Sequence, residues 1–251
     1  MDQTTLLAVE RAAIRAWPAL ETRDIGGWLW RYSAGGSQRA NSVAALADPG
    51  LDPEAAIDEA EALYADRGAR PQFQITDAAN PSDLDARLAR RGYRFNDPCT
   101  TLAADLNGNT VMPAEAVFLR RADAEWFETY ASVITANRKA VAPQILARVP
   151  AEAVFVGIRL GGRIAATTLV VLDCPVAIVE CVATHPDARR QGAARLAMYA
   201  AMRWANDHGA RIMALGAVAA NAPAQALYAA LGFRLVGRYH MRIKDLREPE
   251  A

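Results

Sequence analysis

The sequence predicts a mixed α/β fold in two tandem halves, and three observations support this prediction. The 251 residues are 52% hydrophobic and 22% charged, as in globular proteins with one large core or two small ones. Strand-like and helix-like segments alternate along the chain. The sequence DRGAR at 66–70 recurs as DHGAR at 207–211, which indicates an internal repeat.

The two copies of the repeat continue in the same order. An apolar stretch, the tripeptide Ala-Ala-Asn and a short helical segment follow in each. Asn80 corresponds to Asn221, and ARLARRGYRF at 86–95 corresponds to ALYAALGFRL at 226–235. The shared pattern is helix, strand, helix, strand. Each copy is also preceded by two predicted strands, at 28–32 and 40–46 in the first half and at 164–172 and 176–183 in the second.

A turn-rich segment separates the halves. The sequence DLNGNT at 105–110 has only one large apolar side chain and is typical of a linker. We therefore predict one domain at residues 1–107 and another at 115–247. The second domain is expected to contain a strand at 116–120, an amphipathic helix at 124–135 and a hairpin, whose strands at 154–160 and 163–172 meet at Gly161 and Gly162.

Composition limits the possible partners and location. Lys plus Arg and Asp plus Glu both number 28, so no global charge attracts nucleic acid or anionic membranes. No stretch reaches the roughly 18 apolar residues of a membrane span, and Glu10 and Arg11 interrupt any signal-peptide core. Cys99, Cys174 and Cys181 lack CxxC spacing and lie among apolar neighbours, as buried thiols in a reducing compartment do. We expect a cytoplasmic monomer or homodimer.

The segment at 182–194 is typical of a phosphate-binding turn. Pro186 ends an extended run, and Arg189 and Arg190 supply positive charge. Gly192 and the two alanines after it are small enough for a ligand to approach the N–H groups of the next helix. The aligned stretch of the first half, DPGLDP at 48–53, is acidic and rich in proline. Only the second half is therefore expected to bind an anion here.

Two motifs give the second half a resemblance to the GNAT superfamily of acyl-coenzyme A transferases. The first is Pro-x-x-Arg-x-x-Gly-x-Ala at 186–194, after a strand and before a helix. The second is Asn-x-x-Ala-x-x-Leu-Tyr-x-x-x-Gly-Phe at 221–233. The resemblance covers residues 116–246 and reaches the first half as a degenerate copy. It implies a mixed, mostly antiparallel central sheet flanked by helices, and acetyl-coenzyme A as co-substrate.

The resemblance also implies the cofactor-binding residues. In this family the strand before the phosphate turn splays from its neighbour, so its amides are free for the pantetheine arm and the thioester; a paired central strand is the alternative. The residues implied for the cofactor are Val182, Ala183, Thr184, Arg189, Arg190, Gln191, Gly192, Ala193, Ala194, Asn221 and Tyr228.

Two side chains match catalytic positions of the family. Glu180 lies in an apolar run, where a carboxylate is costly unless it faces water, a partner or a site. The resemblance implies that it is the general base for an acceptor amine; a structural salt bridge is the alternative. Tyr228 matches the general acid that protonates the leaving thiolate, because a phenol stays protonated at neutral pH. Packing of Tyr228 on an apolar helix face is the alternative.

The first half offers a possible wall for the acceptor pocket. Trp30, Arg39 and Asn41 belong to a short stretch with aromatic, basic and amide groups, although tryptophans packed on a sheet face explain the pattern equally well. His185, His208 and His240 show no metal-ligand spacing, so no metal is predicted.

Together these features predict an acetyl-coenzyme A-dependent N-acetyltransferase. The acetyl group is expected to move by direct attack to a primary amine of a small molecule or peptide, because no cysteine lies in a recognisable catalytic setting. A non-catalytic acyl-coenzyme A sensor or partner-binding module is the main alternative. An ordinary nucleotide-binding α/β domain is a third. The sequence does not choose among acceptors.

Overall fold

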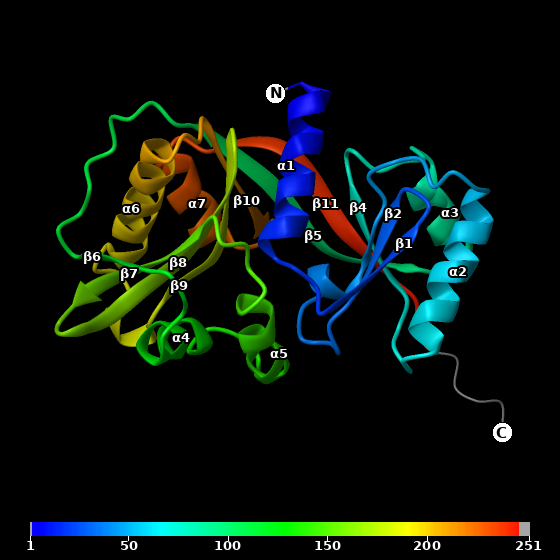
Figure 1. The fold of residues 1–251 in the computed structure, drawn as a ribbon, viewed down its shortest axis with the longest axis horizontal. Coiled ribbons are helices and arrows are strands. Elements are labelled where there is room, and N and C mark those ends of the chain that lie inside the picture. The colour runs from blue at the N-terminus through cyan, green and yellow to red at the C-terminus, as the bar shows by residue number, and fades with distance from the viewer. Residues whose placement is uncertain (1, 246–251) are drawn as a thin grey trace.

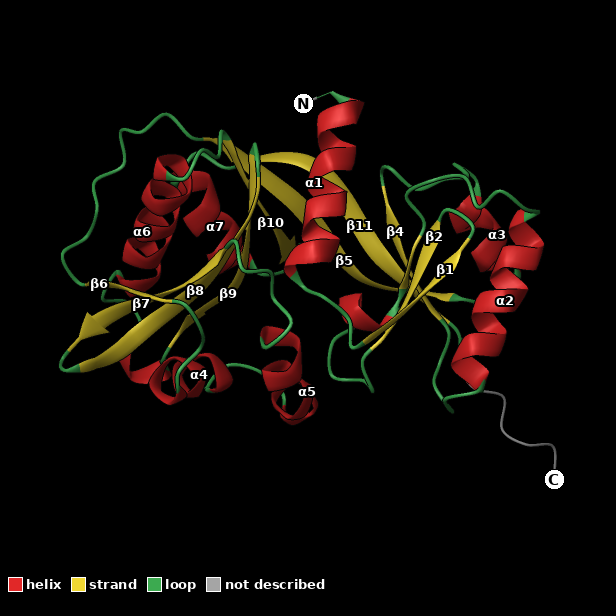
Figure 2. Cartoon of the chain, viewed as in Figure 1, coloured by secondary structure: helices red, strands yellow, loops and turns green. Residues whose placement is uncertain are grey.

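The computed structural model describes residues 2–245 and contains one mixed, mostly antiparallel sheet with helices on both faces (Figure 1; Figure 2). The strand order is β1-β2-β3-β4-β11-β5-β10-β9-β8-β7-β6. The strands are β1 Glu21–Ile25, β2 Trp28–Tyr32, β3 Val43–Ala44, β4 Gln72–Thr76, β5 Arg94–Asp105, β6 Ala116–Leu119, β7 Ala153–Leu160, β8 Arg163–Asp173, β9 Val176–Thr184, β10 Ile212–Val218 and β11 Arg234–Ile243.

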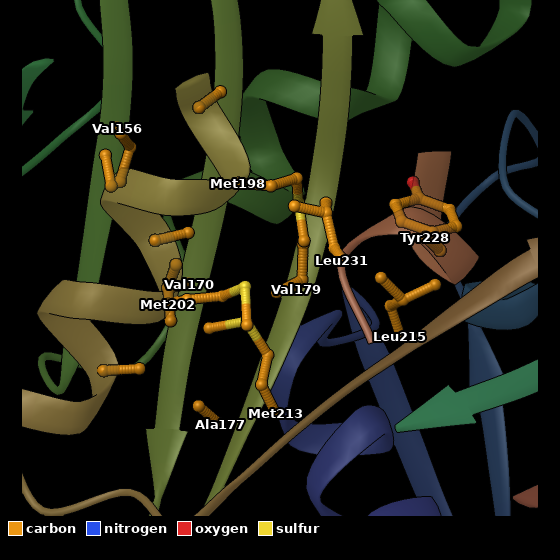
Figure 3. Close-up of a cluster of buried hydrophobic side chains, with 14 of the residues drawn as sticks. Val156, Val170, Ala177, Val179, Met198, Met202, Met213, Leu215, Tyr228 and Leu231 are labelled. Atoms are coloured by element: carbon orange, nitrogen blue, oxygen red, sulfur yellow. The ribbon is translucent and has the colours of Figure 1, made fainter. Parts of the chain in front are cut away.

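Helices cover this sheet in separate groups. They are α1 Gln3–Ala16, α2 Pro53–Ala65, α3 Leu84–Arg90, α4 Ala124–Ala131, α5 Ala136–Leu146, α6 Ala193–Asp207 and α7 Ala222–Ala230. Helices α6 and α7 pack on one face through a core that includes Met198, Met213 and Leu231 (Figure 3). Helices α1, α4 and α5 cover a second core on the other face, and α2 and α3 enclose a third in the first half.

The two halves exchange their last strands. Strand β11, from the end of the chain, lies between β4 and β5 of the first half, and β5 lies between β11 and β10. Figure 1 shows these two long strands side by side at the centre of the molecule. All three ladders are antiparallel; Thr76 faces Tyr239, Tyr239 faces Cys99, and Cys99 faces Val218. The sheet is therefore continuous across the predicted linker.

Two predicted elements are shorter in the structure by several residues. The strand predicted at 40–46 is reduced to Val43–Ala44, because Arg39–Asn41 form a 3-10 turn. The helix predicted at 124–135 ends at Ala131, because Thr135 is the N-cap of the next helix and accepts a hydrogen bond from the Arg138 N–H. Residues 246 and 247, the predicted ends of the resemblance and of the second domain, lie outside the described residues.

The cysteines are all free, and Cys99 and Cys181 are buried as predicted. The prediction is wrong for Cys174, which is exposed at the turn between β8 and β9. None of the helices in residues 2–245 has the length and apolar character needed to cross a bilayer.

Candidate active site

The sheet opens between β9 and β10, as the GNAT resemblance implied. Their parallel ladder runs from Val176 paired with Ile212 to Val179 paired with Leu215, and then stops. Beyond that point β9 continues from Glu180 to Thr184 without a partner on the β10 side. The paired-strand alternative is therefore wrong for this segment, and Val182, Ala183 and Thr184 lie along an open edge inside the sheet.

A bulge in β9 marks the start of this opening. Cys181 has a φ of +54°, and the pairing with β8 shifts register between Leu169 and Thr167. The Thr167 hydroxyl donates a 3.0 Å hydrogen bond to the Cys181 carbonyl and holds the bulge in place. An extra residue in one strand bends it and re-aims its side chains. The bulge therefore turns the end of β9 away from β10.

The phosphate-binding turn forms an open loop before α6. Arg189, Arg190, Gln191 and Gly192 are exposed, and Arg190 and Gly192 have φ values of +62° and +78°. A methyl group built on Gly192 would meet only a terminal nitrogen of Arg195, 4.0 Å away. Helix α6 starts at Ala193, and the N–H groups of a first helical turn have no partner within the helix. This geometry is suited to an anion such as a pyrophosphate.

Glu180 is buried and paired across the two halves. Its oxygens Oε1 and Oε2 accept hydrogen bonds of 2.6 and 2.5 Å from Nη1 and Nη2 of Arg39. The Glu180 side chain is 6% exposed and that of Arg39 is 20% exposed. Burial lowers the pKa of Arg39, but the Glu180 carboxylate more than offsets this effect, and the pKa is raised. Arg39 thus forms an ion pair with Glu180, the predicted base, and the sequence did not indicate this contact.

Tyr228 lies on α7 beside the opening, with its ring packed on Phe233 and its hydroxyl group at one end of the apolar core (Figure 3). Burial and the nearby charge of Glu180 raise the pKa of Tyr228 to about 12. The phenol is therefore protonated at neutral pH and can donate a proton. Asn221 is the N-cap of the same helix and accepts a 3.3 Å hydrogen bond from the Ala224 N–H.

The sequence analysis missed residues that surround Glu180 from other strands. Tyr239 on β11 is 8% exposed, and its pKa is raised by burial, with Cys99 and Glu180 also contributing. A methyl group on Gly216 of β10 would lie 2.8 Å from the Tyr239 hydroxyl, so the glycine allows this tyrosine to approach β10. No local pattern in the sequence indicates this contact, because it depends on the strand exchange.

Glu10 is a second missed residue, and its carboxyl group lies near Arg39. It is 4% exposed on α1, and its Oε1 accepts a 3.0 Å hydrogen bond from the Thr101 hydroxyl of β5. Burial raises the pKa of Glu10 to about 7. One signal was present in the sequence, since Glu10 lies four residues after Leu6 on the apolar face of an amphipathic helix.

The remaining residues proposed for the acceptor wall are not brought to this opening. Trp30 is fully buried in the core of the first half against Tyr32 and Tyr64, as the packing alternative held. Asn41 is 4% exposed, and its amide group bonds to the backbone of Gly35 and Ser37. Of the three residues, only Arg39 contacts another predicted site residue.

A hollow of about 1030 Å³ lies elsewhere, between β6, α4 and the end of α5. Phe118, Phe155 and Trp204 are among its lining residues, and no predicted site residue is. We therefore place the candidate site by the opening of the sheet rather than by this hollow. Within residues 2–245, no group of three or more His, Cys, Asp or Glu side chains is arranged to hold a metal ion.

The splayed strands, the open turn before α6 and the tyrosine on α7 define a GNAT acyltransferase. Comparison with known proteins agrees. The chain belongs to the family described as "Probable histone acetyltransferase Rv0428c C-terminal", whose profile matches residues 4–242. It is 29% identical over 245 residues to the "Uncharacterized N-acetyltransferase YobR" of Bacillus subtilis. The alignment covers 94% of this chain and 97% of that protein.

Solved structures show the same fold. A GCN5-related N-acetyltransferase from Kribbella flavida matches with a TM-score of 0.71 and 19% identity, covering 97% of this chain and 95% of that one. A tandem GNAT protein from the clavulanic acid biosynthesis pathway matches with a TM-score of 0.61 and 19% identity, covering 76% and 69% of the two chains. The tandem arrangement therefore occurs in a structural neighbour.

Proposed function

We propose that this acyltransferase uses acetyl-coenzyme A and moves the acetyl group directly to a primary amine in a ternary complex. The observation that carries the proposal is the continuous path from the open turn before α6, along the unpaired edge of β9, to Glu180 and Tyr228. A phosphate site, a row of backbone donors and two titratable side chains follow one another along this path.

The residues fit the parts of coenzyme A. The pyrophosphate is placed at Arg189–Ala194, where exposed arginines and free helical N–H groups favour an anion. The pantetheine arm is placed along Val182, Ala183 and Thr184, with Asn221 on the other side of the opening. We assign to backbone N–H groups of the unpaired part of β9 the stabilisation of the negative charge that develops on the thioester oxygen.

In the proposed reaction Glu180 accepts a proton from the amine, and Tyr228 donates one to the leaving thiolate. An alkyl ammonium has a pKa near that of lysine, ~10.4, so it must lose a proton before it can attack. Glu180 accepts this proton, directly or through a water molecule. The amine nitrogen forms a bond to the thioester carbon, the carbon–sulfur bond breaks, and Tyr228 protonates the leaving thiolate. The nitrogen then gives its second proton to the Tyr228 phenolate, and Glu180 releases the first to water. The buried, protonated state of Tyr228 supports this role.

The test combines a free-thiol release assay over a panel of amines with calorimetry of coenzyme A binding. We expect binding of coenzyme A and thiol release that depends on one class of amine. Tyr228→Phe and Glu180→Gln should both retain cofactor binding and lose turnover. Binding without acceptor-dependent release would favour the sensor alternative. Equal binding of adenine nucleotides that lack pantetheine would contradict both.

A further inference from the structure

The reacting centre contains a charged pair whose members come from different halves of the chain. Arg39 and Glu180 are 141 residues apart in sequence and form two parallel hydrogen bonds of 2.6 and 2.5 Å. Such a fork between a guanidinium and a carboxylate fixes the orientation of both groups. The orientation of Glu180 is therefore set by the first half.

The loop that carries Arg39 is braced on both sides. Asn41 bonds to the backbone of the loop at Ser33, Gly35 and Ser37, and the Ser42 hydroxyl donates to the Arg39 carbonyl at 3.1 Å. On the other side Gly36 lies so close to α5 that a methyl group there would overlap the Asn137 carbonyl. The loop is thus tied to both halves before any ligand binds.

The surroundings of Glu180 make a counter-ion necessary. Its strand neighbours Val179 and Cys181 are buried. The pKa values of Tyr228, Tyr239 and Cys181 are raised, by burial first and with a contribution from the negative charge of Glu180. These three groups are neutral at pH 7, and Glu10, on α1 near Arg39, supplies no positive charge. Among these groups Arg39 supplies the positive charge, and a buried carboxylate without a counter-ion is costly.

We propose that Arg39 is a positioning residue that the first half supplies to the reacting centre, where its two hydrogen bonds hold the Glu180 carboxylate in place and aim it at the acceptor amine. The inference rests on the proposed role of Glu180 as proton acceptor. It gives the degenerate half a part in catalysis that does not require a second cofactor site.

The experiment compares Arg39→Gln with Arg39→Lys, using the amine found in the panel above. Arg39→Gln should lower kcat by about tenfold or more, because a displaced base loses its alignment. The KM for acetyl-coenzyme A should stay within about twofold, since Arg39 does not contact the cofactor turn. Arg39→Lys restores the charge but not the two parallel hydrogen bonds, so it should recover only part of kcat.

Arg87→Gln is the matched control, because Arg87 pairs with Glu54 and Asp83 at the surface of the first half. This control should behave as the wild type. An Arg39→Gln enzyme with unchanged or increased kcat would overturn the inference while leaving the proposed function intact. An inactive wild type would instead overturn the proposed function, and the inference with it.

Thermal unfolding provides a test that needs no acceptor. Each of Arg39→Gln and Glu180→Gln leaves one buried charged partner without its counter-ion and the two parallel hydrogen bonds, so each should lower Tm. The double variant should lose less than the sum of the two single losses. Additive losses would show that the two side chains are not coupled in solution, which would also overturn the inference.

Discussion

The two halves each contain a hairpin with a Gly-Gly turn, and the two turns lie in opposite environments. In the first half the turn at Gly26 and Gly27 packs directly on the loop at 48–53, so that a methyl group on Gly26 would overlap the Pro49 carbonyl. In the second half a methyl group on Gly161 or Gly162 would meet nothing within 4 Å. Arg163, beside this open turn, bonds instead to Asp187 at the start of the phosphate turn.

This contrast shows how one architecture supports a ligand site in one half and not in the other. The loop of the first half that matches the phosphate turn is acidic, and its backbone at Asp48 and Pro49 packs against the turn at Gly26 and Gly27. Strand β3 has two residues where β9 has nine, and buried Leu88 stands where Tyr228 stands in the second half. The first half instead contributes Arg39, which pairs with Glu180, and Glu10, which lies near Arg39.

The largest expected effect comes from separating the halves. A fragment of residues 108–251 should not form a stable folded monomer, because β11 loses β4 and β5 and β10 loses β5. Circular dichroism and gel filtration of the fragment would measure this. Coexpression with residues 1–107 should restore a folded complex. A fragment that melts cooperatively as a monomer would contradict the role given to the exchanged strands.

The next effect compares Tyr228 with its counterpart. Tyr228→Phe should lower kcat by about 100-fold, which is the lower end of the usual effect of a general acid, with little change in the KM for acetyl-coenzyme A. Leu88→Met in the first half should leave kcat unchanged, because it conserves buried volume. Steady-state kinetics of both variants would measure the difference. Equal effects would mean that Tyr228 acts through packing alone.

Glu10 tests the buried charge between the halves. Thr101, Arg39, Arg31 and Asp77 surround its carboxyl group, and its pKa is about 7 against the ordinary 4.5. The raised pKa means that folding disfavours the charged form, so stability is lost as pH rises from 4.5 through 7. Glu10→Gln should therefore stabilise the protein by about 2–3 kcal/mol at pH 8 and by almost nothing at pH 4.5. Urea unfolding at both pH values measures this; a gap independent of pH would contradict it.

The smallest effect compares matched glycines in the two loops. Gly192 and Gly50 have φ values of +78° and +70°, and a methyl group on either would meet no atom closer than 4.0 Å. Asparagine tolerates this conformation. Gly192→Asn should weaken coenzyme A binding by about 5- to 30-fold, or 1–2 kcal/mol, and Gly50→Asn should not. Calorimetry should also give one coenzyme A site per chain. Two sites per chain would contradict the expectation that only the second half binds the cofactor.

Local motifs explain what could be predicted from the sequence. The turn at Gly192, the helix cap at Asn221 and the tyrosine seven residues later depend on short-range spacing, and the GNAT fold follows from them. The hairpin at 153–173 was also predictable, because its two strands are adjacent in sequence. The strand at 40–46 was predicted too long, because nothing in its apolar pattern showed that Arg39–Asn41 turn.

The remaining features depend on contacts between distant residues. Strand β5 has the same sequence pattern whether it pairs with its own half or with β10 and β11, so hydrophobic periodicity cannot show the exchange. The pair of Arg39 and Glu180 follows from that arrangement. A buried Glu180 did indicate that a partner or site was needed, but it could not say which arginine would provide the counter-ion.

The strand exchange also constrains the order in which the chain can fold during synthesis. Strand β5 is complete at residue 105, whereas its partners begin at residues 212 and 234. The first half therefore emerges from the ribosome with the edges of β4 and β5 unpaired. These edges stay unpaired until more than a hundred further residues have been synthesised. At about 5–20 residues per second, this interval lasts on the order of ten seconds. Assembly of the two halves is thus a late, long-range step, and mutations in β11 should affect the folding yield of the whole chain.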